Sequence, residues 1–322
     1  MKTLVTGAAG FVGFHLSLKL LKKGVKVVGV DNVNKYYSQK LKISRINELK
    51  KFKNFIFIRA DICKNKAYKL LEKYKSEIDY IYHFAGQAGV RYSIQKPEVY
   101  IKNNILAFVK FLEFFKLEKK LKLIFFASSS SVYGDKSKSS SLQSVDRPLS
   151  IYSASKISME LIANVYAVLY KKKIIGMRFF TVYGPWGRPD MSYYKFCDLA
   201  AKNKPIKVYN YGNHFRSFTF IDDLINNVLL IKKYYMKNKN FFSKVYNIGD
   251  PKTLKLEKFI SILESVMSYK FTKIKVSKQM GDVIKTQANL TKEKKFSFKF
   301  RTKTEEGLKK FYNWYQIYNK NY

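Results

Sequence analysis

The sequence predicts an α/β fold in which helices cover both faces of a doubly wound parallel sheet. Apolar runs of strand length alternate with helical stretches through the first half of the chain. A turn with three glycines, Gly7, Gly10 and Gly13, directly follows the first apolar run. With 322 residues, 47% of them hydrophobic, the chain can bury a sizeable core. One large or two modest domains are therefore expected.

The opening stretch reads as a strand over residues 3–6, the glycine turn, and a helix that runs to Leu21. Glycines at such a turn let the backbone approach a pyrophosphate, which the helix N-terminus stabilises with its N–H groups and dipole. Asp31 ends the next strand, where a carboxylate can accept hydrogen bonds from an adenosine ribose. The pattern predicts dinucleotide binding. It favours NAD over NADP because a carboxylate repels a 2′-phosphate.

The following elements continue the alternation up to residue 180. Strands are predicted at 25–31, 55–61, 79–86, 121–131 and 172–180, and helices at 35–52, 67–75, from about 97 to 115, and from 152 to 169. Residues 84–86 end the fourth strand, at the edge of the sheet where ligands bind in doubly wound folds.

Beyond residue 180 the pattern is looser. A Gly/Pro-rich loop over 183–190 precedes a helix, the mixed segment 205–223, a helix over 226–235, a short strand over 245–249, and helices over 256–267 and from Thr304. We therefore predict a dinucleotide-binding domain over residues 1–180. A smaller α/β substrate lobe is expected over 181–322, with the two interlaced.

Composition excludes several classes of protein. Two cysteines, Cys63 and Cys197, and three scattered histidines are too few for a disulfide framework or a zinc site, so no metal is expected. No apolar run reaches the roughly 18 residues of a membrane span, and no signal peptide precedes the first strand. The simple expectation is a cytoplasmic enzyme that does not contact a membrane.

The formal charge of +39 raises the question of nucleic-acid binding. The 62 basic residues of the chain are mostly lysines spread over helix faces and loops, and the arginines that would read bases are scarce. No nucleic-acid motif accompanies them. We expect no specific nucleic-acid partner, although the charge suits an anionic substrate.

Tyr152 and Lys156 form the candidate catalytic pair. A tyrosine and a lysine at i and i+4 share one helix face, and a nearby ammonium favours the phenolate and so lowers the tyrosine pKa towards that of a general base. The spacing alone is weak evidence, since it also begins at Tyr36, Tyr92, Tyr235 and Tyr269. Only Tyr152 opens a helix after a buried strand that ends in serines, within the half that carries the glycine turn.

Those serines, residues 128–131, end the fifth strand. A hydroxyl at this edge can bond the reacting oxygen of a substrate and help to move its proton. Ser129 is the best third catalytic residue by its position relative to Val132. Ser130 is a supporting contact.

Six motifs together closely resemble the nucleotide-sugar epimerases of the extended short-chain dehydrogenase/reductase superfamily. They are AGQAGVRYS, ASSSSVYG, YSASK, FFTVYGPWGRPDM, RSFTFIDD and QMGDV. Within that family the chain is most similar to bacterial UDP-glucuronate 4-epimerases of the capsular polysaccharide type. The resemblance implies a Rossmann-type fold, tightly bound NAD, a UDP-sugar substrate, transient oxidation at C4, and a homodimer.

The resemblance also assigns residues to sites. It implies cofactor contacts from Gly7, Gly10, Phe11, Val12, Gly13, Asp31, Asn32, Asp61, Ile62, Phe84, Ala85, Gly86, Asn103, Tyr152, Lys156 and Phe180. It implies substrate contacts from Arg91, Ser129, Ser130, Thr181, Arg188, Tyr209, Arg216 and Asp282. Arg188 could supply the bidentate cation that a C6 carboxylate needs.

Alternative functions on the same fold require other residues. A 4,6-dehydratase needs an acid–base pair where Ser130 and Ser131 stand, and a decarboxylating relative needs a carboxylate in the same cluster. Both are rejected. A 4-epimerase of UDP-glucose, or of a UDP-N-acetylhexosamine or its uronate, remains open. A non-enzymatic NAD-binding regulator would normally lose Tyr152 or Lys156, and both are present.

Overall fold

The computed structural model describes residues 1–135, 139–140, 145–237, 240–279 and 281–321. The chain divides into two compact units. The first unit comprises Met1–Gly134, Ser144–Phe179 and Leu229–Tyr246. The second comprises Asp135–Gln143, Phe180–Val228 and Asn247–Tyr322. The serine-rich sequence over residues 136–144 predicts a surface loop, and its residues 136–138 and 141–144 lie outside the described residues.

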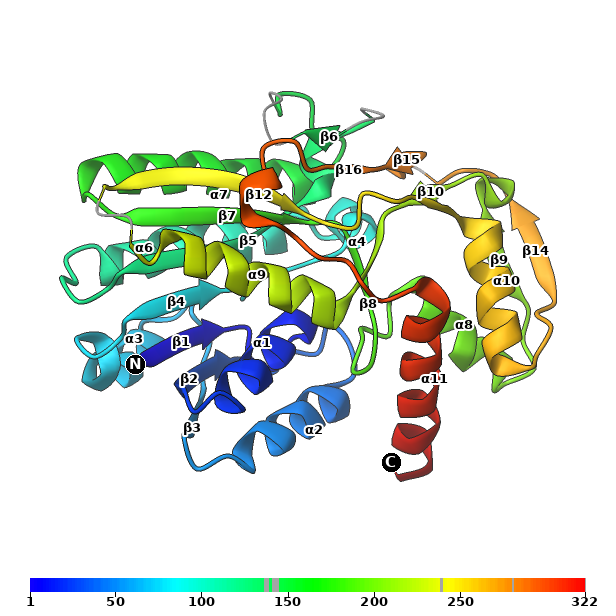
Figure 1. Cartoon of the computed structure of the whole chain (residues 1–322), viewed down its shortest axis with the longest axis horizontal. Helices are drawn as coiled ribbons and strands as arrows, with labels where there is room; N and C mark the ends of the chain where they lie inside the picture. Colours follow the sequence, from blue (N-terminus) through cyan, green and yellow to red (C-terminus); the bar gives the residue numbers. More distant parts are fainter. Residues whose placement is uncertain (136–138, 141–144, 238–239, 280, 322) are drawn as a thin grey trace. The chain divides into compact units, whose positions relative to one another are not determined.

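A seven-stranded sheet forms the centre of the first unit (Figure 1), in the order β12-β7-β5-β4-β1-β2-β3. The strands are β1 (Lys2–Thr6), β2 (Lys26–Asp31), β3 (Phe55–Arg59), β4 (Tyr80–His83), β5 (Leu123–Ser129), β7 (Lys173–Phe179) and β12 (Phe242–Ile248). The ladders of the first six are parallel. β1 lies between β2 and β4, so the strand order reverses beside it, as in doubly wound sheets. The predicted fold class is confirmed.

Helices cover both faces of this sheet (Figure 1). The bounds of the helical segments are α1 (Phe11–Leu21), α2 (Gln39–Lys50), α3 (Asn65–Lys75), α4 (Val90–Gln95), α5 (Pro97–Tyr100), a π-helical segment (Ile101–Leu106), α6 (Ala107–Phe115), a 3₁₀ turn (Ser130–Tyr133), α7 (Ile151–Leu169) and α9 (Ile221–Tyr235). Apolar side chains of α3, α6 and α7 join those of the strands in one buried cluster. Phe108, Phe111 and Phe126 are fully buried there.

Two predictions about elements are corrected. The helix predicted from about 97 to 115 is interrupted by the π-helical segment, whose wider turns place Asn104 inside the protein. The strand predicted at 245–249 is longer and forms the seventh strand of the central sheet. Phe242 N donates to Lys172 O and Phe180 N donates to Ile248 O, so β12 runs parallel to β7. A local apolar pattern cannot reveal a strand partner about 70 residues away.

The described residues of the second unit form short strands, three helices of its own and the first part of α9, which spans both units. Its described elements are β6 (Ser139–Ser140), β8 (Thr181–Tyr183), α8 (Ser192–Ala200), β9 (Ile206–Tyr209), a 3₁₀ turn (Asn210–Gly212), β10 (Phe215–Arg216), β11 (Phe218–Phe220), β13 (Leu254–Lys255), α10 (Leu256–Met267), β14 (Lys273–Val276), β15 (Lys285–Thr286), β16 (Ala288–Asn289), a 3₁₀ turn (Lys294–Phe296) and α11 (Thr304–Asn321). Across the described residues of both units, no helix is long and apolar enough to cross a membrane.

Candidate functional site

The glycine turn after β1 forms a cradle that leaves no room for side chains. Gly7 has φ +72°, and a Cβ built on it would lie 2.7 Å from Ala85 N. A Cβ on Gly13 would lie 2.1 Å from Gly7 O, so the first turn of α1 packs directly against the loop. No side chain caps α1 at Gly10. The turn therefore presents backbone and a helix N-terminus, which suits a pyrophosphate. Phe11 and Val12 lie in this first helical turn.

Asp31 is fixed at the end of β2 by two backbone donors. Its Oδ2 accepts from Ala9 N at 3.0 Å and its Oδ1 accepts from Val33 N at 2.8 Å. Burial raises the pKa of Asp31, while the Val33 N–H and the cations Lys42 and Arg45 oppose this shift. The carboxylate is held beside the glycine turn, where its remaining lone pairs can accept ribose hydroxyls. Next to it, Asn32 Oδ1 accepts from Asn34 N.

Arg45 on α2 is a site residue that the sequence analysis missed. Its side chain is fully buried, and Nη1 donates to Ala9 O and to Tyr37 Oη, both at 2.7 Å. The side chain thus binds the glycine turn from behind. The sequence feature that could have identified Arg45 is a basic residue on the buried face of a predicted helix. The many lysines around it make this feature hard to recognise.

The catalytic candidates lie where α7 begins. Ser150 caps this helix in a capping box with Ser153, which fixes where its first turn starts. Lys156 Nζ donates to Ala127 O at 2.8 Å and lies 6.0 Å from the centre of the Tyr152 ring. Burial lowers the pKa of Lys156 to about 8, although Glu160 opposes the shift. The structure therefore brings Tyr152 and Lys156 together on one helix face, as predicted.

The serines occupy the end of β5 and the turn after it. Ser129 Oγ accepts from Ser131 N at 3.2 Å and from Ser131 Oγ at 3.0 Å, which leaves the proton of Ser129 to be donated. Ser128 turns the other way and donates to Glu160 Oε1 at 2.5 Å. Ser130 begins the 3₁₀ turn and is half-buried. Ser129 is thus oriented by its neighbour at the carboxyl edge of the sheet.

Other predicted cofactor residues end the neighbouring strands. Phe84 N and Ala85 N donate to the backbone O and to Oγ1 of Thr6, which fixes the segment 84–86 beside β1. Asp61 Oδ1 accepts from Cys63 N, and Ile62 between them is buried. The Cys63 thiol contacts Asn103 Oδ1 at 3.1 Å in the π-helical segment. These residues come from the ends of β3 and β4 and from that segment.

Asn104 is a second residue that the sequence analysis missed. It is fully buried, and its amide is saturated: Oδ1 accepts from Gln87 N at 2.7 Å, while Nδ2 donates to Gln87 O and to Ser155 Oγ at 2.8 Å. It ties the segment after β4 to α7. Asn103 and Asn104 are consecutive, and the sequence does not show which of the two faces inward.

The predicted substrate residues of the second unit have partners of their own. Arg188 makes a bidentate ion pair with Asp190, at 2.9 and 2.5 Å. Arg216 donates to three backbone carbonyls, those of Phe215, Val283 and Ile284. Phe180 is buried, while Thr181 and Tyr209, at the start of β8 and the end of β9, and Asp282 are half-buried. In the first unit Arg91 lies exposed on α4.

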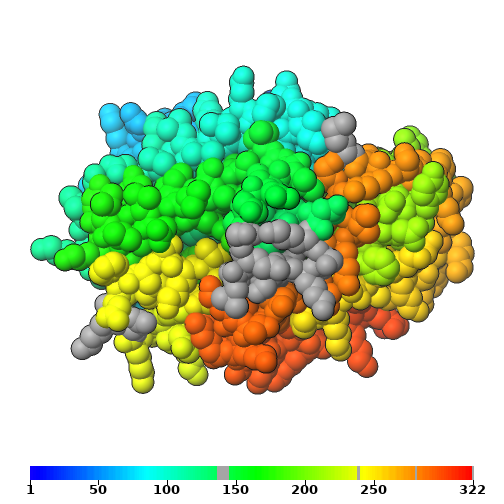
Figure 2. Space-filling view, turned by 90° about the horizontal axis from the view of Figure 1, so that it is seen from above, coloured from blue at the N-terminus to red at the C-terminus, as the bar shows by residue number. Residues whose placement is uncertain are grey.

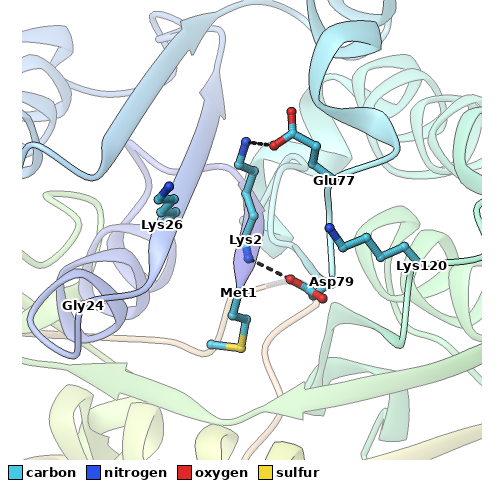
Figure 3. Close-up of a pocket in the computed structure, with 7 residues that line it drawn as sticks. All are labelled: Met1, Lys2, Gly24, Lys26, Glu77, Asp79 and Lys120. Carbon is cyan, nitrogen blue, oxygen red and sulfur yellow. Dashed lines mark hydrogen bonds and ion pairs between the residues drawn. The ribbon is translucent and has the colours of Figure 1, made fainter.

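A separate pocket of about 250 Å³ lies at the amino ends of the strands, away from this edge (Figure 3). Lys2 donates to Asp79 through its backbone N and pairs with Glu77 through its side chain. Doubly wound sheets bind ligands at the opposite edge, so we do not assign the active site here. No three His, Cys, Asp or Glu residues come close enough to hold a metal ion in the described part of the chain.

The lowered pKa of Lys156 predicts that this residue destabilises the fold near neutral pH. Its ammonium is disfavoured in the folded state, so the cost is full below pH 8 and vanishes as the pH rises from about 8 to about 10.5. The free energy of unfolding of Lys156→Met should exceed that of the wild type by about 1–2 kcal/mol at pH 7, after allowing for the lost hydrogen bond to Ala127 O. Urea titrations of both proteins at pH 7 and pH 10 test this. A stability difference that does not narrow at pH 10 would contradict it.

Comparisons with known proteins agree with this geometry. The chain is 40% identical to the protein CapI of Staphylococcus aureus, over 99% of this chain and 100% of that protein. It is 39% identical to UDP-glucuronate 4-epimerase 5 of Arabidopsis thaliana, over 98% of this chain and 75% of that protein. The crystal structure of UDP-glucuronic acid 4-epimerase from Bacillus cereus, in complex with UDP-glucuronic acid and NAD, superposes with a TM-score of 0.91 at 34% identity, over 99% and 100% of the two chains. A family model matches residues 3–249, and the chain belongs to the NAD dependent epimerase/dehydratase family.

Proposed function

We propose that this protein is an NAD-dependent enzyme that interconverts UDP-glucuronate and UDP-galacturonate by epimerisation at C4. The observation that carries the proposal is the Tyr152–Lys156 pair, held against Ala127 O at the carboxyl edge of the sheet. Full-length likeness to UDP-glucuronate 4-epimerases supports the reaction and the sugar.

The glycine cradle fits NAD. A Cβ on Gly7 would clash with the backbone of Phe84 and Ala85, and one on Gly13 would clash with Gly7 O, so the tight turn requires glycine at both positions. No side chain caps α1, and Asp31 is anchored for a ribose. Gly7, Gly10, Gly13 and Asp31 would therefore hold the adenosine diphosphate part, with Asp61, Phe84 and Asn103 as further contacts. The chemistry that NAD would supply when bound is reversible acceptance of a hydride from C4 of the sugar.

The residues of the first unit move the proton. Tyr152 accepts the proton of the 4-hydroxyl and gives it back after the sugar has turned over. Lys156 favours the phenolate, because its ammonium lies one helical turn away. The Ser129 hydroxyl donates to the same sugar oxygen, since its own oxygen already accepts from Ser131. Ser130 supports this contact. The reaction returns NAD to its starting state, so no net redox change is expected.

The second unit supplies contacts to the UDP-sugar. Arg216 and Asp282 would hold the diphosphate and the uridine ribose, with Tyr209 beside them. Thr181 stands where epimerases of the galactose type usually have asparagine. Arg188 would bind the C6 carboxylate by exchanging Asp190 for the substrate, and Arg91 is a second candidate. UDP-glucose and N-acetylhexosamine substrates are the rival proposals.

The test is to incubate the purified protein with UDP-glucuronate and analyse the products for UDP-galacturonate, with UDP-glucose and UDP-N-acetylglucosamine in parallel. Conversion of a neutral sugar alone would overturn the substrate assignment. Tyr152→Phe should reduce turnover at least about a hundredfold, because the general base is lost. It should leave the melting temperature and the bound NAD unchanged. Full activity of that variant would overturn the mechanism, and the exposed Tyr211→Phe is its control.

Arg188 provides a test of substrate choice. Arg188→Ala should lower kcat/KM for UDP-glucuronate by about 10- to 100-fold, because a bidentate charged contact is lost. Any activity with UDP-glucose should change much less. Asp190→Asn removes the competing carboxylate and should leave uronate turnover intact or improve it. Equal losses with both sugars would remove Arg188 from the proposal.

A homodimer is the proposed assembly. α7 exposes Leu161, Val165 and Val168, spaced three to four residues apart, and Leu169 next to the last of them. Figure 2 shows the green part of the chain, which includes α7, at the surface. Leu161→Lys should halve the mass measured by sedimentation equilibrium, because a charge in an apolar interface is costly. Ile317→Lys, on an equally exposed residue of α11, is the control. A wild-type mass of one chain would contradict the dimer.

A further inference from the structure

A buried network of four side chains lies directly behind the catalytic pair, and the mechanism above does not use it. Glu160 Oε1 accepts from Arg178 Nε at 2.8 Å, and Oε2 accepts from Arg178 Nη2 at 2.6 Å. Oε1 also accepts from Ser128 Oγ, while Arg178 Nη1 donates to Tyr133 Oη at 2.9 Å. All four residues are buried. The network therefore joins α7, the end of β7, the end of β5 and the 3₁₀ turn after it.

The network fixes residues adjacent to the proposed reacting groups both on β5 and on α7. Along β5, Ala127 O binds Lys156, Ser128 binds Glu160, and Ser129 is the proposed donor to the substrate. Along α7, Lys156 and Glu160 are four residues apart and share one face. The strand end and the helix are thus bonded at two successive positions, and only the second bond depends on a carboxylate. A charged pair of this kind is costly to bury, and it can be replaced by apolar residues without loss of stability in some proteins, so stability alone does not explain it.

We propose that Glu160, locked by Arg178, is a positioning residue that sets the charge state of Lys156 and the placement of Ser129 relative to it. This inference deepens the proposed function, and its kinetic consequence rests on that function. Glu160 touches neither the substrate nor the cofactor in this scheme. It acts through Lys156 on its own helix and through Ser128 on the strand.

The electrostatic part of the inference depends on the groups around Lys156. Among the described residues, the titratable or charged groups around Lys156 are Tyr152 and Glu160 on α7, His83 at the end of β4, and Arg178 of β7 as the partner of Glu160. Burial, with Lys156 as the second cause, lowers the pKa of His83 to about 3, so His83 is neutral at physiological pH. Glu160 is then the anion that raises the pKa of Lys156 against burial. Without it, the ammonium that stabilises the Tyr152 phenolate would be lost at a lower pH.

The test is Glu160→Gln in the full-length protein. The pH midpoint for trace acetylation of Lys156, followed by peptide mass spectrometry, should fall by about one unit relative to the wild type. The alkaline limb of kcat should move to lower pH by the same amount. A folded Glu160→Gln protein with an unmoved midpoint would overturn the inference. Glu264→Gln is the matched control. Glu264 lies in the second unit, where it is also buried and forms an ion pair with Lys273, so its substitution should leave the Lys156 midpoint unchanged.

A double variant covers the case in which the single variant does not fold. Glu160→Leu with Arg178→Met removes both charges, so it leaves no uncompensated guanidinium inside the protein. Its Lys156 midpoint should still fall, though less than in Glu160→Gln, because a cation that repels the ammonium is also gone. An unmoved midpoint in this folded protein would equally overturn the inference. The acetylation measurement does not depend on turnover. If the wild-type protein failed to convert UDP-glucuronate, the proposed function would be rejected, but the shift of the Lys156 midpoint would still test the role of Glu160.

Discussion

The hydrogen bond from Lys156 Nζ to Ala127 O is the constraint around which the first unit is arranged. A buried ammonium must have acceptors, and the strand end supplies one only if α7 begins at the right residue. The capping box at Ser150 fixes that start, and Asn104 holds Ser155 from the opposite side. The pKa of Lys156, lowered to about 8, is the cost of keeping this cation beside a tyrosine in the interior. Burial of Lys156 therefore lowers the stability of the fold below pH 8, and it places the ammonium beside the proposed catalytic tyrosine.

Much of the first unit could be predicted because its signals are local. The β1–turn–α1 stretch, the acid at the end of β2 and the Tyr152–Lys156 spacing each lie within a window of about 20 residues. Glycine spacing and helical periodicity report directly on backbone geometry within such windows. The parallel direction of the strands followed from the alternation of strands and helices. The structure places these residues at the predicted edge of the sheet.

The missed features depend on contacts between distant residues. Arg178 lies within an apolar strand and Glu160 within an otherwise ordinary helix, and only their meeting makes either residue meaningful. A partner for Arg178 could have been suspected, since a charged side chain in a buried strand needs an oppositely charged partner. The second unit offered less, because its strands of two to four residues pair across long separations, as β6 with β16. Two-residue strands carry no periodicity to detect.

Arg45 links α2 to the glycine turn that we propose holds the pyrophosphate of NAD. Because its guanidinium holds Ala9 O, opening of α2 would release the loop whose shape the pyrophosphate requires. The local stability of α2 and the affinity for the dinucleotide are then linked thermodynamically, so each strengthens the other. A surface substitution that frays α2 would weaken dinucleotide binding without touching any residue of the binding loop.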